Sequence, residues 1–376
     1  MKSIKLLVML MAMVTASNAQ NIVSSKFGKG IKIKAEDESF SMKFSTRIQN
    51  RYEGAFDLGE TQTDYSDKIY LRRARLKFDG YAFSPKLVYK IEFDAVNGFI
   101  LDAAVKWKIA PSFELWAGQT KLPGNRERVI SSQKLQFVDR SMLNSRFTLD
   151  RDKGVQLRHK MKVGKVLVRS IVALSLGEGL NYKGSSNGHS YTGRVEVLPF
   201  GKFTNKGDYF ASDLSREAKP KLALAATYEY NQKAQLSRGQ KGSEISLGSD
   251  LGNLQADLMF KFNGISIMGE YAYRTVVNGE TVSLNLLGDV DESYFTGSAV
   301  NLSMGYLFKN NWETAIRYTV ISPESITRES DITEYTFGIS RYVVGHNLKV
   351  QGDITYRQMA GENDSVLPRL QFEVSF

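Results

Sequence analysis

The last strand of the chain constrains its fold more than any other feature. Apolar residues alternate with polar ones up to the terminal aromatic residue, and one face reads Val366, Pro368, Leu370, Phe372, Val374 and Phe376. The opposite face carries Arg369, Gln371, Glu373 and Ser375. A strict period of two that closes on an aromatic residue is typical of the last strand of an outer-membrane β-barrel. We therefore expect the protein to reside in the cell outer membrane.

The N-terminal segment has the three regions of a secretory signal peptide. Two lysines begin it, an apolar run follows over residues 4–16, and Ser17-Asn18-Ala19 is a small-x-small cleavage site. We expect a signal peptide over residues 1–19 and one mature domain over residues 20–376, the alternative being an uncleaved N-terminal helix. The apolar run is too short to cross a bilayer as a helix. Because the chain contains no cysteine, we expect neither a lipoprotein anchor nor a disulfide framework.

Alternation of apolar and polar residues recurs in about sixteen segments of the chain. They fall at 40–51, 70–79, 87–94, 101–109, 111–120, 153–162, 165–176, 189–199, 220–232, 252–263, 264–275, 294–309, 310–321, 332–344, 346–359 and 365–376. Each segment has one apolar face and one polar face. In a membrane barrel the apolar face contacts lipid and the polar face lines the lumen. The sequence therefore predicts an all-β protein, a transmembrane antiparallel β-barrel of about sixteen strands. The segments at 111–120 and 165–176 alternate least clearly, which leaves fourteen or eighteen strands open.

The connections between these segments alternate between short and long, which orients the barrel. Short turns such as Ser84-Pro85 and Asn263-Gly264 are expected at the periplasmic end, and Trp107 and Trp312 beside such turns suggest an interfacial aromatic girdle. The connection at 200–219 is long although it falls on the periplasmic side, and the sequence offers no reason for this. Long loops are expected at the extracellular end, near residues 53–67, 120–152, 177–190, 231–251 and 276–293.

One long loop, from about residue 121 to residue 153, is strongly basic. It carries eight basic and four acidic residues, a net charge of +4, namely Lys121, Arg126, Arg128, Lys134, Arg140, Arg146, Arg151 and Lys153 against Glu127, Asp139, Asp150 and Asp152. A loop of this length in a barrel commonly folds into the lumen and narrows it, and arginine or lysine at such a constriction attracts anions. The alternative is a solvated loop on the outer surface that binds lipopolysaccharide phosphates.

The charge of the whole chain admits two interpretations. The net charge is +10, and removal of the two signal-peptide lysines leaves +8, from 48 basic and 40 acidic residues. Basic chains often bind nucleic acid. Here the basic residues fall mostly on one face of the strands, and the signal peptide and the terminal strand argue against a nucleic-acid partner. The pattern favours a basic pore.

Four motifs in the first half of the chain are similar to those of a known family. They are Phe44-Ser45-Thr46-Arg47-Ile48-Gln49, then Tyr70-Leu71-Arg72-Arg73-Ala74-Arg75-Leu76-Lys77-Phe78, then Gly118-Gln119 with Glu127-Arg128 and Ser131-Ser132, and last Asp152-Lys153-Gly154-Val155-Gln156-Leu157. Together they resemble the phosphate-selective porin O and P family. The likeness is good over about residues 38–160, and beyond them only the strand pattern and the Val197-Leu198-Pro199-Phe200 turn are similar.

The resemblance implies an outer-membrane porin that passes phosphate or other small anions by passive diffusion, and it implies a homotrimer. It implies that Arg47, Arg72 and Arg73 belong to an arginine ladder on the pore wall. Arg128 would lie on the constriction loop, and Asp102 would be a lumen acid that helps to pass the anion on. Strand parity by itself also directs Arg47, Arg73 and Asp102 inward. Arg72 has outward parity, unless a bulge or the end of its strand intervenes.

Two features of the family are matched only in part. A second inward-folding segment should carry further basic residues, for which Arg238 and Lys241 are candidates. The lysine cluster expected near the entrance is represented by Lys32 and Lys34. A general anion or small-solute porin therefore stands beside a strictly phosphate-selective one.

Two other classes of barrel are alternatives to a porin. An outer-membrane hydrolase needs a catalytic site, but the chain has three histidines, His159, His189 and His346, and no nucleophile elbow, metal-ligand cluster or phosphate-cradling glycine motif. A structural or adhesive barrel would conduct nothing, whereas about sixteen strands leave an aqueous channel. We expect no catalysis, no metal and no cofactor, and as partners the outer-membrane lipid, lipopolysaccharide and small anions.

Overall fold

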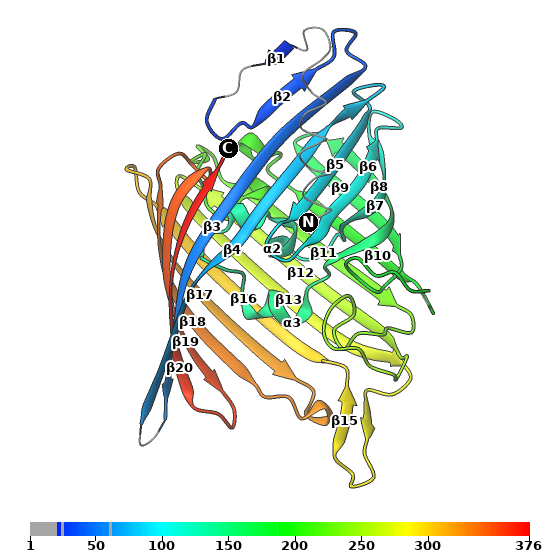
Figure 1. The fold of residues 1–376 in the computed structure, drawn as a ribbon, viewed down its shortest axis with the longest axis vertical. Helices are drawn as coiled ribbons and strands as arrows, with labels where there is room; N and C mark the ends of the chain where they lie inside the picture. The colour runs from blue at the N-terminus through cyan, green and yellow to red at the C-terminus, as the bar shows by residue number, and fades with distance from the viewer. Residues whose placement is uncertain (1–20, 24–25, 60–61, 186) are drawn as a thin grey trace, which may run out of the picture.

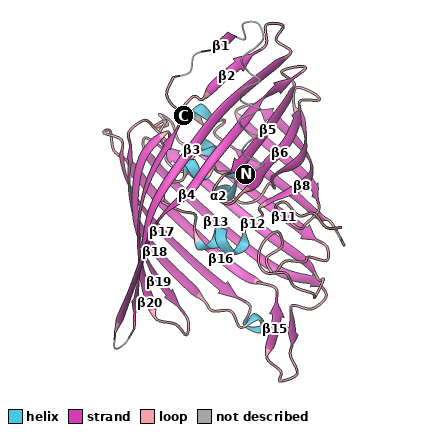
Figure 2. Cartoon of the chain, in the orientation of Figure 1, coloured by secondary structure: helices cyan, strands magenta, loops and turns pink. Residues whose placement is uncertain are grey.

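A computed structural model describes residues 21–23, 26–59, 62–185 and 187–376, so the expected signal peptide lies outside the described residues. In the described part, sixteen long strands form a closed antiparallel barrel (Figures 1 and 2). They are β3 (Phe40–Leu58), β4 (Thr63–Ala82), β5 (Leu87–Asp94), β6 (Phe99–Trp107), β7 (Phe113–Lys121), β8 (Arg151–Val163), β9 (Val166–Ser175), β10 (Ser190–Leu198), β11 (Lys221–Asn231), β12 (Asp250–Phe262), β13 (Ile265–Asn278), β16 (Gly297–Leu307), β17 (Trp312–Pro323), β18 (Ile332–Tyr342), β19 (Leu348–Met359) and β20 (Asp364–Ser375).

Each of these strands pairs with its neighbour in the chain, and the last pairs with the first. The closing pair, β20 with β3, runs from Ser375 opposite Arg47 to Asp364 opposite Leu58. The predicted fold class and strand number are therefore confirmed. The two least clear segments are also barrel strands, β7 and β9.

The outer and inner faces of the barrel differ as the alternation predicts. Val105, Val172 and Ile316 are about half exposed on the outer face, where lipid would cover them. Trp107 and Trp312 are also exposed there, both beside short turns. Within the described residues, no helix has the length and apolar character that a membrane crossing requires.

The first hairpin is longer than the sequence predicts. A loop was expected near residues 53–67, but β3 continues to Leu58 and β4 begins at Thr63. The prediction is wrong because this end of the hairpin extends beyond the rest of the barrel (Figure 1), where both faces meet water and the apolar alternation is no longer needed. Backbone pairing continues without it, supported by the packing of the Phe56 and Tyr65 rings at 4.7 Å.

Two small hairpin elements lie outside the sixteen strands. β2 (Ile31–Lys34) pairs with β1 (Asn21–Val23) and with the start of β3, beyond the point where β20 ends. The expected entrance lysines, Lys32 and Lys34, lie on β2 at the end of the barrel that carries the C-terminus. At the opposite end, β14 (Val282–Leu284) and β15 (Val290–Ser293) form a hairpin in the loop after β13.

The connection between β7 and β8, residues 122–150, folds into the lumen, and we call it the constriction loop. It contains α2 (Arg126–Val129), the 3₁₀ turn η2 (Ser132–Lys134) and α3 (Met142–Phe147). Leu143 and Phe147 of α3 are fully buried in an apolar cluster with side chains of the barrel wall. The expectation of an inward loop is confirmed, and the alternative of a solvated outer loop is wrong.

A glycine on the wall allows the constriction loop to approach closely. Gln136 of the loop donates from Nε2 to Ser266 Oγ at 2.9 Å and to Glu313 Oε1 at 2.8 Å. A Cβ atom at Gly305 of β16 would lie 1.8 Å from that same nitrogen. A larger residue at this position would therefore displace the side-chain amide of Gln136 and disturb its contacts with the wall.

The long periplasmic connection, residues 199–220, also turns inward, and we call it the periplasmic insert. It contains the 3₁₀ element η3 (Thr204–Tyr209). The buried ammonium group of Lys261 donates to three of its carbonyl oxygens, those of Gly207, Phe210 and Ser212, at 2.7 to 2.9 Å. Further along the chain, the 3₁₀ turn η4 (Ser325–Thr327) lies between β17 and β18.

The periplasmic insert supports the constriction loop from below. The backbone N–H of Ala211 donates to the carbonyl of Lys134 at 2.9 Å. Phe203 and Ala211 share an apolar cluster with Ile130 and Leu135 of the loop. This contact explains the unusual length of the connection, because a short turn could not reach the loop inside the barrel.

Candidate functional site

A cavity of about 1710 Å³, which we call the open path, lies in the barrel beside the constriction loop and is lined mainly by strands β3 to β9. Its lining reaches from Lys241 in an extracellular loop to Lys162 beside a periplasmic turn. Among the described residues it is lined by 23 lysines and arginines and by eight aspartates and glutamates, a formal balance of +15. All five residues singled out in the sequence, Arg47, Arg72, Arg73, Asp102 and Arg128, line this one cavity.

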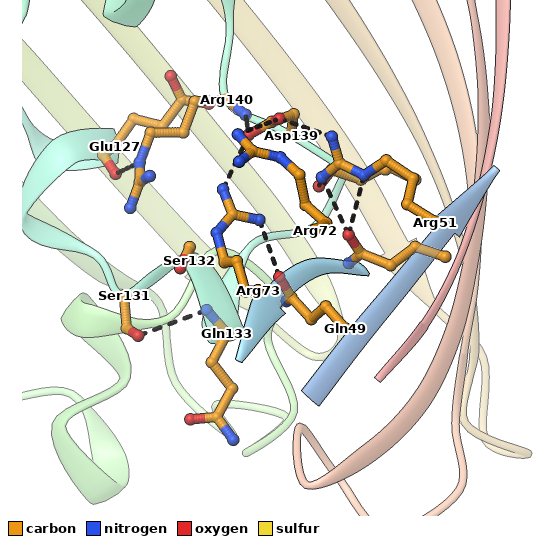
Figure 3. Close-up of polar contacts among 12 residues, drawn as sticks. Gln49, Arg51, Arg72, Arg73, Glu127, Ser131, Ser132, Gln133, Asp139 and Arg140 are labelled. Atoms are coloured by element: carbon orange, nitrogen blue, oxygen red, sulfur yellow. Dashed lines mark hydrogen bonds and ion pairs between the residues drawn. The ribbon is translucent and has the colours of Figure 1, made fainter. Parts of the chain in front are cut away.

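A group of arginines on β3 and β4 faces the constriction loop (Figure 3). Three guanidinium groups converge on the carboxylate of Asp139. Arg51 Nη1 lies 2.9 Å from Oδ2, whereas Arg72 Nη2 and Arg73 Nη2 each lie 3.4 Å from a carboxylate oxygen. We call Arg51, Arg72 and Arg73 the arginine cluster.

A β-bulge explains how neighbouring arginines both face the lumen. Gln49 of β3 pairs with Arg73, but the next residue, Asn50, pairs with Leu71, so Arg72 is the extra residue of β4. A bulge re-aims the side chain of its extra residue. Strand parity had favoured Arg73 over Arg72, yet Arg72 is the more accessible, with a third of its side chain exposed. Tyr70 shares the even-numbered, outward parity of Ala74 and Phe78, but beyond the bulge it pairs with the inward Arg51.

The constriction loop contributes hydroxyl groups and basic groups to the same region. Arg47 Nη2 donates to Ser132 Oγ at 3.0 Å. Arg128 pairs with Asp150, which also contacts Lys241 at 2.9 Å. The guanidinium group of Arg140 is held by backbone carbonyls of the loop rather than by a carboxylate in the described part of the chain.

Asp102 has a positioning role in this arrangement. It is almost fully buried and accepts from Arg151 Nε at 3.0 Å and from Lys90 Nζ at 2.5 Å. Both of these cations line the path. The carboxylate therefore fixes the positions of two cations at the wall of the path.

Cations crowd at the constriction, which leaves hydrogen-bond donors in surplus. Burial, with Arg140 and Arg151 close by, lowers the pKa of Arg128 well below its usual value. Arg47 Nη1 and Arg128 Nε are buried and have no hydrogen-bond acceptor among the described residues. An acceptor-rich anion would satisfy such donors and relieve the repulsion between the cations.

A network between the constriction loop, the periplasmic insert and strands β9, β10 and β12 shows balanced ion pairing. There Arg126, Arg169 and Arg194 meet three carboxylates, those of Glu196, Asp208 and Asp257. Arg126 and Arg194 are almost completely buried, with Arg126 Nε 3.0 Å from Asp257 Oδ1. Three positive and three negative groups cancel, so this network joins the constriction loop to the wall without a surplus of charge.

Towards the periplasm, cations rest on aromatic rings instead of on carboxylates. Lys106 Nζ and Arg158 Cζ each lie 3.7 Å from the ring centre of Trp116. Lys134 Nζ lies 3.7 Å from the ring centre of Phe210 in the periplasmic insert. A cation–π contact fixes the position of a cation and leaves its charge uncompensated.

Sequence reasoning found part of this site and missed the rest. The second inward-folding segment that it sought is the loop after β11, where Arg238 and Lys241 both line the path. Asp139, Arg140 and Arg151 were recognised only as charges of the basic loop. Arg51 had the correct inward parity, but no sequence signal shows that it contacts a loop residue 88 positions away.

Two of the three histidines, His159 and His346, pack against aromatic rings in the structure. His159 stacks on Phe113 at 4.4 Å, and His346 is buried between the rings of Phe210 and Tyr342. Over the described ranges, no group of three or more His, Cys, Asp or Glu side chains is placed to hold a metal ion.

A closed barrel of sixteen strands with an inward loop and an open path defines an outer-membrane porin. Comparison with known proteins agrees. A family model described as phosphate-selective porin O and P matches residues 42–248, which is more than half of the chain and extends beyond the motifs. The chain therefore belongs to the phosphate-selective porin O and P family. A search of curated protein sequences finds no match.

Solved structures share the fold at low sequence identity. An anion-selective porin from Comamonas acidovorans is 9% identical with a TM-score of 0.57, over 90% of this chain and 100% of that one. The outer membrane channel DcaP of Acinetobacter baumannii is 12% identical with a TM-score of 0.56, over 91% and 99%. OmpT, an outer membrane protein of Vibrio cholerae, is 10% identical with a TM-score of 0.55, over 95% and 100%. These likenesses support the fold.

Proposed function

We propose that this porin prefers anions and lets phosphate and other small anions diffuse passively across the outer membrane. The observation that carries the proposal is the lining of the path, 23 basic against eight acidic side chains among the described residues. Long-range attraction by such a surface concentrates anions and excludes cations at physiological ionic strength. In this role Arg47, Arg72, Arg73 and Arg128 attract the anion, and Asp102 holds two further cations in place.

The contrast with the balanced network around Arg126 and Arg194 supports a functional origin for the surplus of basic residues. If basic residues served only to fix the inner segments, they would be matched by carboxylates, as they are around Arg126 and Arg194. Along the open path 23 cations face eight carboxylates among the described residues, and Asp102, Asp139 and Asp150 are each shared by two or more of these cations. Unpaired charge in a lumen costs stability, so it is expected where the solute supplies the counter-charge.

The rival functions have less support. A structural or adhesive barrel would not require a path that reaches from Lys241 to Lys162. Hydrolysis would require an activated nucleophile or a metal-bound water, and the buried, ring-stacked His346 provides neither. We therefore propose a channel without catalysis and without a cofactor.

Single-channel recording in a planar bilayer tests the proposal. Refolded protein that lacks residues 1–19 should show an anion-selective reversal potential under a tenfold KCl gradient, and inorganic phosphate should block the chloride current. The double variant Arg73→Ala, Arg128→Ala should lower the anion/cation permeability ratio. Weak selectivity without block would point to a general diffusion porin, and folded barrels without conductance would refute the proposal.

Two expectations from the resemblance also become proposals. We propose that residues 1–19 are removed on export and that the mature chain assembles as a homotrimer in lipid and lipopolysaccharide. Mass spectrometry of the mature N-terminus tests the first, and multi-angle light scattering of the detergent-solubilised protein tests the second. An intact N-terminus or a monomer mass would contradict the respective proposal.

A further inference from the structure

Asp139 occupies the place in the arginine cluster where an anionic solute would bind. Its carboxylate contacts Arg51, Arg72 and Arg73, and it lines the open path with about a quarter of its side chain exposed. By contrast, the buried pair of Arg194 with Asp257 is closed to solvent. Asp139 is thus a carboxylate that a solute in the path can reach.

The side chain stays ionised at every pH at which the porin would work. Burial alone would raise the pKa of Asp139, but the guanidinium groups of Arg73, Arg51 and Arg72 outweigh burial and hold this pKa well below its usual range. A carboxylate and a phosphate oxyanion compete for the same guanidinium donors, because both accept charge-assisted hydrogen bonds from the planar fork.

The contacts of Asp139 differ in strength, and the weaker ones face the path. Arg51 is bound tightly, since it also donates to Glu53, to Gln371 and to the carbonyl of Val138. Arg72 has no other hydrogen-bond acceptor than Asp139 in the described part of the chain, and their distance of 3.4 Å is near the limit for such a bond. The Arg72 donors that Asp139 leaves unused are those that a passing anion would meet first.

We propose that Asp139 is an internal counter-ion of the pore, which shares the arginine cluster with each permeating anion and so sets the affinity of the site. The inference rests on the proposed function, since it requires that anions pass here. A conducting site must bind an ion strongly enough to admit it and weakly enough to release it. The fixed carboxylate weakens binding at the cluster and thereby speeds release.

The Asp139 carboxylate accepts from the backbone N–H of Arg140 at 3.0 Å, a bond that an Asn amide oxygen can keep, and further contacts that do not involve the carboxylate hold the backbone around it. The N–H of Val138 donates to Asp353 Oδ2 at 2.9 Å, and its carbonyl accepts from Arg51 at 3.0 Å. The carbonyl of Asp139 itself accepts from Arg317 at 2.9 Å. The constriction loop should therefore keep its place in Asp139→Asn.

The test is phosphate block of the chloride current in Asp139→Asn and in the wild type, at 0.1 M KCl. Removing a unit charge from within about 4 Å of the bound anion should lower the half-blocking concentration of inorganic phosphate about tenfold or more, and the shift should shrink at 1 M salt. In the double variant Asp139→Asn, Arg72→Ala, the half-blocking phosphate concentration should return most of the way to the wild-type value.

Glu334→Gln is the matched control. Glu334 lines the same cavity, but its ion-pair partner is Arg357, at 2.7 Å, and not a member of the arginine cluster. Loss of this charge should change the half-blocking concentration of inorganic phosphate by less than twofold. Equal shifts in the two variants would show that only the total charge matters, which overturns the proposal.

A purely structural role for Asp139 predicts the opposite sign. If the carboxylate served only to hold the loop, its loss would loosen the constriction, raise conductance and noise, and weaken block. That result would overturn the proposal while wild-type anion selectivity stood, whereas a wild type without anion selectivity would refute the proposed function itself. Should Asp139→Asn not fold, Asp139→Ser carries the same measurement, with the same two outcomes.

Discussion

The bulge in β4 leads to a prediction that strand parity alone would reverse, namely that Arg72 governs selectivity more than Arg73. Arg72 is one-third exposed in the path and has a single loose ion pair, to Asp139 at 3.4 Å. Arg73 is almost buried and donates to Gln49 Oε1 at 2.8 Å as well. Arg72→Ala should therefore remove a charge that solutes meet directly, and Arg73→Ala one that lies behind it.

The size of the effect follows from the contact distance. An anion about 4 Å from the Arg72 guanidinium group gains about 1 kcal/mol in a medium as polar as water. This energy corresponds to roughly a fivefold change in occupancy, and a cation experiences the opposite change. The anion/cation permeability ratio should thus fall by at least about fivefold in Arg72→Ala at 0.1 M salt, and by less at 1 M, where the Debye length is about 3 Å.

The assay is the reversal potential of each variant under a tenfold KCl gradient, with Arg72→Lys as the control that keeps the charge. Arg72→Lys should stay within about twofold of the wild type, while its phosphate block weakens because the planar fork is lost. If Arg73→Ala changed the ratio more than Arg72→Ala did, the bulge would not direct Arg72 into the permeation path and the reasoning would be refuted.

Three further predictions concern the periplasmic half of the pore. Lys261→Met should release the periplasmic insert, residues 199–220, and increase single-channel conductance and current noise; an unchanged current would show that the insert is held without Lys261. Trp116→Phe should remove most of the tryptophan fluorescence that iodide quenches, because Lys106 and Arg158 concentrate anions at that ring; equal quenching by caesium would contradict this. Burial and neighbouring lysines lower the pKa of Lys134 to about 8, so the anion/cation permeability ratio should be higher at pH 6 than at pH 9, and Lys134→Gln should flatten that dependence.

The barrel itself could be predicted because a membrane imposes a local rule on every strand. Each crossing segment must present lipid with alternate residues, so a period of two remains visible even in the weakest strands, β7 and β9. This alternation is required only where a strand contacts lipid. That is why the ends of β3 and β4 were mistaken for a loop near residues 53–67, and why the extra residue of the bulge reversed the direction that parity alone gives to Tyr70.

The inner segments could be predicted only in outline, because their contacts join residues far apart in the chain. The basic character of the constriction loop indicated that it would enter the lumen, but nothing in residues 199–220 shows that Ala211 will bond to Lys134 or that Lys261 will hold three carbonyls. Such pairings depend on the closed barrel, which brings the two segments to the same depth.

Arg126 and Arg128 show most clearly why a charged loop does not by itself define a pore lining. Both belong to α2 and both contributed equally to the predicted basic constriction. Successive residues of a helix are about 100° apart, so residues two positions apart point to opposite sides. Arg126 accordingly enters the balanced network with Glu196 and Asp257, while Arg128 faces the open path beside Asp150. The charge available to a solute is therefore decided by which face of α2 the wall covers, and only the second arginine can take part in selectivity.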